Sequence, residues 1–247
     1  PSWRADAPAT LTWLEALDGG DPTREVQKRD RILAVDAPFT AQARTLFETE
    51  WRARGLTWGR ADLAIAREAN SKSRKARTWI IDPSGKAAPR LLFERSTEDR
   101  YADPGDFRTR RDARGQQVMH FTADGKSAFL SGTGASAEGD RPFLDRMELA
   151  SGKTERLFRS TAPYYETVVD LLDDRGTRLL TRRESVDEAP NYFARDLVRR
   201  IAPAQLTQFK DPAPQFAGVK KEVVQYQRND GVTLQATVYL PPGYDKA

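Results

Sequence analysis

Hydrophobic and polar positions alternate along this chain in short blocks that are typical of β-strands. Each block spans about four to eight residues, and clusters rich in Gly, Pro, Asp and Ser separate the blocks. One block recurs with a Leu-Phe pair, at Leu46-Phe47, Leu92-Phe93 and Leu157-Phe158, and Leu206 to Phe209 form a looser fourth copy. Similar blocks at a regular spacing indicate a repeat architecture.

Another strand and a tight turn precede the first three copies. The expected strands are Ile32 to Asp36, Trp79 to Ile81 and Met147 to Leu149, and Asp82 to Gly85 is the clearest of the turns. Gly, Pro and Asp supply the preset or positive φ that turns need, and the flanking β-branched and aromatic residues suit a half-buried pleated surface.

Two further strands are expected upstream in each unit, and Asp124-Gly125 and Asp174-Arg175-Gly176 are hairpin turns between such strands. Four strands in a unit of roughly fifty residues are typical of a propeller blade. The predicted fold is therefore all-β, with a β-propeller segment of about four blades, each of four antiparallel strands. The upstream segments are Ala9 to Leu17, Gly55 to Arg67, Gln116 to Ser131 and Thr167 to Thr181.

Residues 62–77 are the least strand-like part of the repeat, because their Ala, Glu, Arg and Lys favour helix. We nevertheless predict a strand at Leu63 to Ala66. Leu63 and Ile65 alternate with small residues, and the segment has the same place in its unit as Phe129-Leu130 and Leu179-Leu180 have in theirs.

The repeat stops after Phe209, at a proline-rich stretch that begins with Asp211 and Pro212. We therefore predict two domains, with the blades in residues 1–211 and a linker with the first strands of another domain in residues 212–247. Glu222 to Gln227 and Val232 to Leu240 are the expected strands, and Asn229-Asp230-Gly231 is the turn between them.

Composition excludes several classes of site and partner. The chain has no Cys, so disulfides, thiolate metal sites and a cysteine nucleophile are ruled out. Its 40 basic and 36 acidic side chains give a net charge of +4, with both signs interleaved. The nearest approach to a basic stripe is Lys72, Arg74, Lys75 and Arg77, and no run approaches the eighteen or so apolar residues of a membrane span. We expect neither nucleic acid nor membrane as a partner.

Candidate catalytic residues are scarce. His120 is the only histidine, and a hydrolytic site would use it as a general base for a nearby nucleophile. It is expected in a strand interior, between Val118 and Phe121, and the Gly-x-Ser-x-Gly pattern of a nucleophile elbow is absent from the sequence. We predict a structural role for His120 and assign no catalytic residue to this chain.

Two other motifs imitate ligand sites. Gly125-Lys126-Ser127 resembles the end of a phosphate-binding loop, but His120 stands where that pattern needs its first glycine, so we expect a hairpin turn. Asp170, Asp173 and Asp174 lack the spacing and closing Glu of a calcium loop. We predict no metal site and no cofactor.

Two surface features remain as candidates. Ser131 to Gly139 is a glycine-rich loop long enough to reach a neighbouring domain, although a solvated loop with no partner is the more common case. A group of basic side chains could supply a positive field to a chamber that admits acidic peptides, and Arg182 and Arg183 are our candidates for substrate binding. The other members of that group are Arg74, Lys75 and Arg77.

The C-terminal hairpin, from Tyr226 through Asp230-Gly231 to Tyr239-Leu240-Pro241-Pro242-Gly243-Tyr244-Asp245, resembles the start of the hydrolase domain in the prolyl oligopeptidase family of serine peptidases. Other stretches resemble the glutamyl endopeptidase branch of that family. They are Ser2 to Asp6, Asp18 to Asp21, Arg77 to Trp79, Asp103 to Gly105, Ser131 to Ala135, Glu138-Gly139, Pro142 to Asp145 and Tyr165 to Val169.

The resemblance implies the second half of a seven-bladed propeller, followed by the first strands of an α/β-hydrolase domain whose Ser, Asp and His triad lies outside this chain. It implies a periplasmic or secreted endopeptidase that cuts after glutamate. The segment would gate and position peptide substrates without catalysing their cleavage, and its partners would be the rest of its own propeller and hydrolase domain. A non-enzymatic propeller that binds a protein or carbohydrate, or a catalytically dead homologue, remains the alternative.

Overall fold

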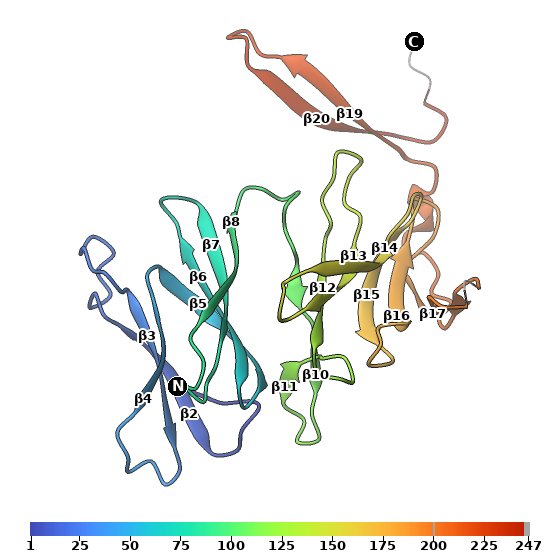
Figure 1. Ribbon diagram of the computed structural model, residues 1–247. Coiled ribbons are helices and arrows are strands. Elements are labelled where there is room, and N and C mark those ends of the chain that lie inside the picture. The colour runs from blue at the N-terminus through green and yellow to red at the C-terminus, as the bar shows by residue number, and fades with distance from the viewer. Residues whose placement is uncertain (200, 245–247) are drawn as a thin grey trace.

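The computed structural model describes residues 1–199 and 201–244, and within them the chain is built from β-strands with no α-helix. The strands form four four-stranded antiparallel sheets and two two-stranded hairpins. Figure 1 shows the four sheets following one another in an open arc, with the last hairpin above the third and fourth sheets. Within the described residues, no helix is long and apolar enough to cross a membrane.

The first two sheets use consecutive strands in chain order. The first contains β1 (Ser2–Trp3), β2 (Thr10–Ala16), β3 (Asp30–Asp36) and β4 (Arg44–Thr49). The second contains β5 (Arg52–Arg60), β6 (Leu63–Asn70), β7 (Lys75–Ile81) and β8 (Arg90–Ser96). The predicted strand at Leu63 to Ala66 is confirmed as the start of β6.

The third sheet has an insertion. Its strands are β9 (Asp106–Phe107), β12 (Ser127–Gly132), β13 (Phe143–Glu148) and β14 (Thr154–Arg159). Between β9 and β12 the chain forms a separate hairpin, β10 (Thr109–Arg111) and β11 (Gln117–Met119), instead of adding to the sheet. The hairpin approaches the second sheet closely, since a Cβ on Gly59 of β5 would lie 3.1 Å from the Met119 sulfur.

The fourth sheet contains β15 (Tyr165–Leu171), β16 (Arg178–Glu184), β17 (Asn191–Asp196) and the short β18 (Ala204–Gln205). The expected fourth Leu-Phe strand at Leu206 to Phe209 is wrong, because β18 ends before it. Side chains bind this backbone in place of a strand ladder: Asn191 Oδ1 accepts the Phe209 N–H at 2.7 Å, and Thr207 Oγ1 accepts the Tyr192 N–H at 2.9 Å.

Both faces of the second and third sheets are buried, because each of these sheets packs against two neighbouring sheets. In β6, Leu63 and Ile65 join a core cluster with the third sheet, whereas Ala64 and Ala66 join one with the first sheet. In β12, Leu130 faces the second sheet and Phe129 the fourth. Successive side chains of a strand point to opposite faces, so one strand serves two cores. The predicted propeller-like stacking of four-stranded sheets is confirmed.

The connections divide between two faces of the arc. The β2–β3, β6–β7, β12–β13 and β16–β17 connections lie on one face, here named the connection face (Figure 1). The chain leaves the fourth sheet on this face, passes through a short 3-10 helix (Pro214–Phe216) and forms the hairpin β19 (Lys220–Gln227) and β20 (Thr233–Leu240). In β20, half-buried Leu234, Ala236, Val238 and Leu240 alternate with exposed residues, as the sequence pattern predicts.

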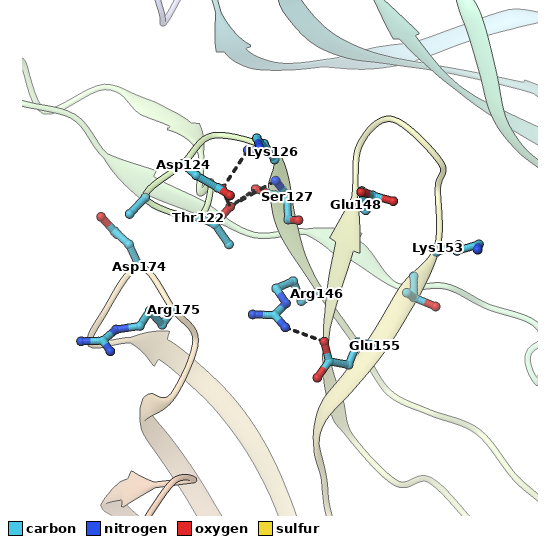
Figure 2. A pocket seen from close by; sticks show the side chains of 12 residues that line it. Thr122, Asp124, Lys126, Ser127, Arg146, Glu148, Lys153, Glu155, Asp174 and Arg175 are labelled. Atoms are coloured by element: carbon cyan, nitrogen blue, oxygen red, sulfur yellow. Dashed lines mark hydrogen bonds and ion pairs between the residues drawn. The ribbon is translucent and has the colours of Figure 1, made fainter.

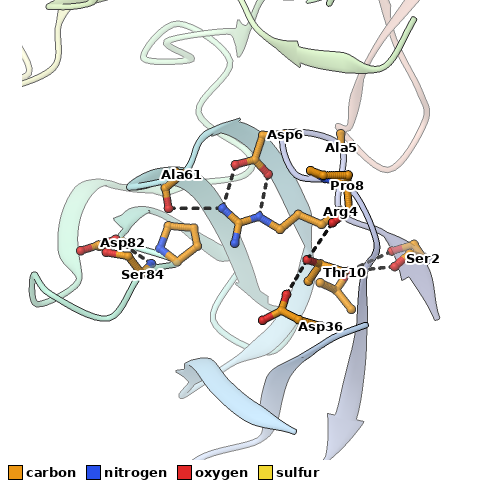
Figure 3. A network of polar contacts seen from close by, with 12 residues as sticks. Ser2, Arg4, Ala5, Asp6, Pro8, Thr10, Asp36, Ala61, Asp82 and Ser84 are labelled. Atoms are coloured by element: carbon orange, nitrogen blue, oxygen red, sulfur yellow. Dashed lines mark hydrogen bonds and ion pairs between the residues drawn. The ribbon is translucent and has the colours of Figure 1, made fainter. Parts of the chain in front are cut away.

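Charged side chains also join neighbouring sheets (Figure 3). Arg4 donates through Nε to Asp6 at 2.7 Å and through Nη2 to the Ala61 carbonyl at 3.2 Å, and its guanidinium lies 5.0 Å from the centre of the Trp58 ring. Because Arg4 follows β1 and Ala61 follows β5, the Ser2 to Asp6 motif links the first sheet to the second.

Candidate functional site

His120 is buried between the third and fourth sheets. It is 3 % exposed and lies just after β11, not in the strand interior that the sequence predicts. Its Nε2 lies 2.9 Å from Asp174 Oδ1, and its ring meets the Phe129 ring edge-on at 5.4 Å. Arg110 donates to the same Asp174 oxygen at 2.7 Å. These contacts agree with a structural role, since the hydrogen-bond partner of His120 is a carboxylate and not a nucleophile.

The Gly125-Lys126-Ser127 segment is a hairpin turn, as expected. Asp124 Oδ1 accepts the Lys126 N–H at 3.0 Å, and Gly125 has a φ of 67°. The turn borders a cavity of about 560 Å³, here named the turn cavity, whose lining includes four basic and four acidic side chains (Figure 2). Arg146 and Glu155 form one ion pair there at 2.5 Å. Its basic and acidic side chains are equal in number, so they give the lining no net charge.

The three aspartates of the fourth sheet do not converge on a common point. Asp173 closes the β15–β16 turn by accepting from the Thr177 hydroxyl at 2.7 Å, while Asp174 contacts His120. In the part of the chain that the structure describes, no group of three or more His, Asp or Glu side chains is arranged to hold a metal ion.

The basic residues of β7 are already paired with carboxylates. Lys75 Nζ lies 3.0 Å from Glu94 Oε1, and Arg77 contacts Glu94 at 2.7 Å and Glu50 at 2.8 Å. The hydrogen bond from Arg77 is the largest of the effects that lower the pKa of Glu94. Arg74, before β7, lies 3.7 Å from Glu98.

Arg182 and Arg183, the candidates for substrate binding, lie near the end of β16 on the connection face. Arg182 is 3.3 Å from Glu184 and Arg183 is 3.1 Å from Glu188. The Arg183 guanidinium also lies 4.1 Å from the ring centres of both Tyr164 and Phe193. Arg183 is thus held by aromatic and acidic neighbours, whereas Arg182 has an ion pair with a longer distance between its charged atoms.

The β12–β13 connection, which contains most of the glycine-rich Ser131 to Gly139 stretch, is folded against itself. The Arg141 N–H donates to the Gly134 carbonyl at 2.9 Å, and Ser136 and Gly139 exchange backbone hydrogen bonds at 3.1 and 3.0 Å. A Cβ on Gly134 would lie 2.0 Å from the Arg141 oxygen, so this position excludes any side chain. The connection rises from the connection face toward the last hairpin (Figure 1).

A second cavity lies at the root of this connection, between the second and third sheets. Its volume is about 280 Å³, and we name it the arginine cavity because four guanidinium groups line it. They belong to Arg54, Arg67, Arg77 and Arg95, and the acidic side chains of the lining are Glu68, Asp103 and Asp106. The sequence pattern does not predict this site, although the Asp103 to Gly105 motif forms part of one wall.

Sequence comparison finds two plant relatives, and no family model matches the chain. A protein of Oryza sativa subsp. japonica named "Probable glutamyl endopeptidase, chloroplastic" is 41% identical over 258 residues, covering 98% of this chain. A protein of the same name from Arabidopsis thaliana is 40% identical over 260 residues, covering 99%. This chain spans 27% of the length of each relative.

Solved structures share the fold at low sequence identity. Oligopeptidase B from Leishmania major aligns over 96% of this chain and 38% of its own, with a TM-score of 0.50 and 8% identity. Oligopeptidase B from Trypanosoma brucei, with bound antipain, aligns over 97% of this chain and 33% of its own, with a TM-score of 0.50 and 13% identity.

Four successive four-stranded sheets, their shared cores and this likeness define the chain as a β-propeller segment. The identity along nearly its whole length shows more than a fold. It relates the chain to part of two plant proteins named as glutamyl endopeptidases, which supports the resemblance to the prolyl oligopeptidase family.

Proposed function

We propose that this chain is the non-catalytic propeller part of a serine endopeptidase, where it admits and positions peptides for cleavage after glutamate. The observation that carries the proposal is identity of about two residues in five along the chain with proteins named as glutamyl endopeptidases. A propeller next to an active site contributes binding and orientation of the substrate and not bond-breaking. The chemistry belongs to an acyl-enzyme site outside this chain.

The domain division at residues 211 and 212 is part of the proposal. The proline-rich stretch follows β18 and continues into the short helix at Pro214–Phe216, and among the described residues the hairpin β19–β20 pairs with none of the four sheets. We assign this hairpin to the start of the α/β-hydrolase domain. The final residue of the motif that suggests it, Asp245, lies outside the described residues.

Hydrolysis of a fluorogenic peptide with glutamate before the reporter group tests the proposal. The full-length protein is expected to cleave this peptide, to lose that activity after treatment with a serine-directed fluorophosphonate, and to leave the glutamine twin of the peptide largely intact. The chain by itself is expected to be inert. If the full-length protein cleaves neither peptide, a catalytically dead homologue or a propeller that binds a protein or carbohydrate replaces the proposal.

Arg182 and Arg183 enter the proposal as residues that attract acidic peptides toward the connection face. Their place at the end of β16 on that face supports it, and the ion pairs with Glu184 and Glu188 limit the field that they supply. Reversing both charges to Glu is expected to lower kcat/KM for the acidic peptide more than for its glutamine twin. Equal kinetics for both would remove these arginines from the proposal.

We also propose export to the periplasm or the exterior, from the family resemblance, whereas both plant relatives are named as chloroplastic. Fractionation of the producing cells, followed by detection of the protein with an antibody, tests this location. Recovery from the cytoplasmic fraction alone would contradict it.

A further inference from the structure

The arginine cavity has the features of a site that is built for a carboxylate. Its lining comes from the second sheet and from the β8–β9 and β12–β13 connections, and the β12–β13 connection lies on the connection face. Its four guanidinium groups outnumber its three carboxylates, whereas the turn cavity has equal numbers of both. The excess alone is small, so the inference depends on which of the arginines still have free donors.

Arg54 has the most free donors. It occupies a β-bulge, because Ala53 pairs with Glu68 and Gly55 pairs with Arg67, which leaves Arg54 opposite no residue of β6. A bulge changes the direction of a side chain, and bulges are common beside functional sites. The Arg54 side chain is exposed and makes no ion pair or hydrogen bond with any residue that the structure describes.

Arg67 lies beside Arg54, and only some of the hydrogen-bond donors of its guanidinium group have partners. Its Nη1 donates to the Thr57 hydroxyl at 2.9 Å, and its Nη2 is 3.6 Å from Asp106 Oδ1, beyond hydrogen-bond distance. The Asp106 side chain is 88% exposed and is therefore free to move away from Arg67. Arg95, by contrast, is held by Asp103 at 2.8 Å. Two adjacent strands thus present two guanidinium groups with unused donors.

The opposite wall of the cavity consists mainly of backbone. A Cβ on Gly105 would lie 2.4 Å from the Ser131 oxygen, and one on Gly132 would lie 2.9 Å from the Phe143 ring. Both positions therefore need glycine, and the wall is fixed in place by close packing between β12 and the connection before β9. The cavity keeps its shape, and its volume of about 280 Å³ suits a side chain better than a whole small molecule.

We propose that the arginine cavity binds a side-chain carboxylate of the peptide substrate, with Arg54 as the principal ligand and Arg67 beside it. This inference rests on the proposed function and names the part of the propeller that selects acidic peptides. A guanidinium group binds a carboxylate through two parallel N–H donors, which gives direction as well as charge. Glutamine in place of glutamate keeps the shape of the side chain and loses that pair.

Peptide binding to the full-length protein tests the inference separately from catalysis. The probe is a fluorescent peptide with one glutamate, N-methylated at the bond that follows it so that it resists cleavage, and its glutamine twin is the reference. Fluorescence anisotropy gives the Kd of each. In the wild-type protein the glutamate peptide is expected to bind about tenfold more tightly than the glutamine peptide, because one charge-assisted hydrogen bond contributes about that much to affinity.

Arg54→Gln is expected to abolish this difference by weakening binding of the glutamate peptide about tenfold and leaving the glutamine peptide unchanged. Arg54→Lys keeps the charge without the paired donors and should fall between the two. The matched control is Arg175→Gln, which removes an exposed arginine from the β15–β16 turn on the face opposite the connection face. This control should bind both peptides as the wild-type protein does.

Equal affinity of the wild-type protein and Arg54→Gln for the glutamate peptide would overturn the inference, as would a failure of the wild-type protein to prefer glutamate. The unmethylated peptide separates this result from the proposed function. Arg54-dependent binding without any cleavage would overturn the peptidase proposal and leave the cavity assignment standing. Cleavage after glutamate that is unaffected by Arg54→Gln would overturn the cavity assignment and leave the peptidase proposal standing.

Discussion

Glu68 shows how one side chain stabilises a junction between strands. It is 1 % exposed, and its carboxylate accepts the Trp51 backbone N–H at 2.8 Å and the Trp79 indole N–H at 2.9 Å. Arg77 lies 3.6 Å from the same carboxylate. A buried donor that loses its acceptor costs more than the hydrogen bond itself contributed, because water does not replace the missing partner.

Glu68→Ala is therefore expected to lower the free energy of unfolding by about 2–4 kcal/mol, since it leaves two N–H donors without an acceptor. Urea unfolding followed by tryptophan fluorescence measures the change. Glu155→Ala is the control, because Glu155 is exposed and, among the described residues, pairs only with Arg146, so its loss should cost about 1 kcal/mol or less. Equal losses for the two variants would contradict the role given to Glu68.

The arginines show which properties of a site can be predicted from the sequence and which depend on the fold. Positive charge at Arg182 and Arg183 is visible in the sequence, but their neighbours Glu184, Glu188 and Tyr164 matter only once β16 and the connections beside it are placed. Arg54 carries no signal of its own, because the bulge that frees it depends on the register between β5 and β6. Tertiary pairing therefore decides which of forty basic residues is available to a ligand.

At the scale of elements, alternation and turn residues predicted most of the long strands. The strand at β6 follows from Leu63 and Ile65 although its composition favours helix, because burial on both faces outweighs intrinsic propensity. The short strands β9 and β18, of two residues each, carry no periodicity and were not predicted. The strand pair expected within Gln116 to Ser131 is only partly correct, because its second strand, β12, joins the third sheet whereas its first, β11, pairs with β10 in a separate hairpin.

The junction between the first and second sheets depends on Asp18, which follows β2 and is 1 % exposed. Its carboxylate accepts from Arg52 at the start of β5 and from Arg29 at 2.8 Å, and Arg52 also reaches Asp30 at 2.5 Å. The hydrogen bond from Arg52 is the main cause that lowers the pKa of Asp18 from 3.8 to about 2, while burial acts in the opposite direction.

A carboxyl whose pKa is lower in the folded state than in the unfolded chain stabilises the fold above the unfolded pKa, and this contribution is lost as the pH falls through the folded value. For Asp18 the loss is expected between about pH 4 and pH 2. Urea unfolding of Asp18→Asn and of the wild-type protein should differ most above pH 4 and converge toward pH 2. Asp62→Asn, at an exposed pair with Arg60, should differ little from the wild-type protein at any pH. A constant gap for Asp18→Asn would contradict this account.

For the whole molecule, the arrangement of the sheets matters more than any one of them. Each inner sheet shares its two faces with two neighbours, so the sheets at the ends of the arc keep apolar side chains that no other described sheet covers. In the first sheet, Trp3 is 60% exposed and Leu14 is 50% exposed, and in the β17–β18 connection of the fourth sheet Val198 and Ile201 are 70% and 58% exposed. A propeller avoids this exposure because its blades form a ring.

The chain by itself is therefore expected to associate through these ends, since exposed apolar surface and open sheet edges both favour contact between copies. Light scattering during size-exclusion chromatography, over a tenfold range of concentration, measures the association. Trp3→Ser with Leu14→Ser should shift the chain toward the monomer, whereas Tyr101→Ser, which changes an exposed aromatic on the β8–β9 connection, should not.

In the full-length protein the ends are expected to be covered by the remaining blades, so the same double substitution should lower its stability and leave its association state unchanged. A chain that stays monomeric throughout would show that its end sheets need no neighbours, and the assignment to a larger ring would lose its main physical argument.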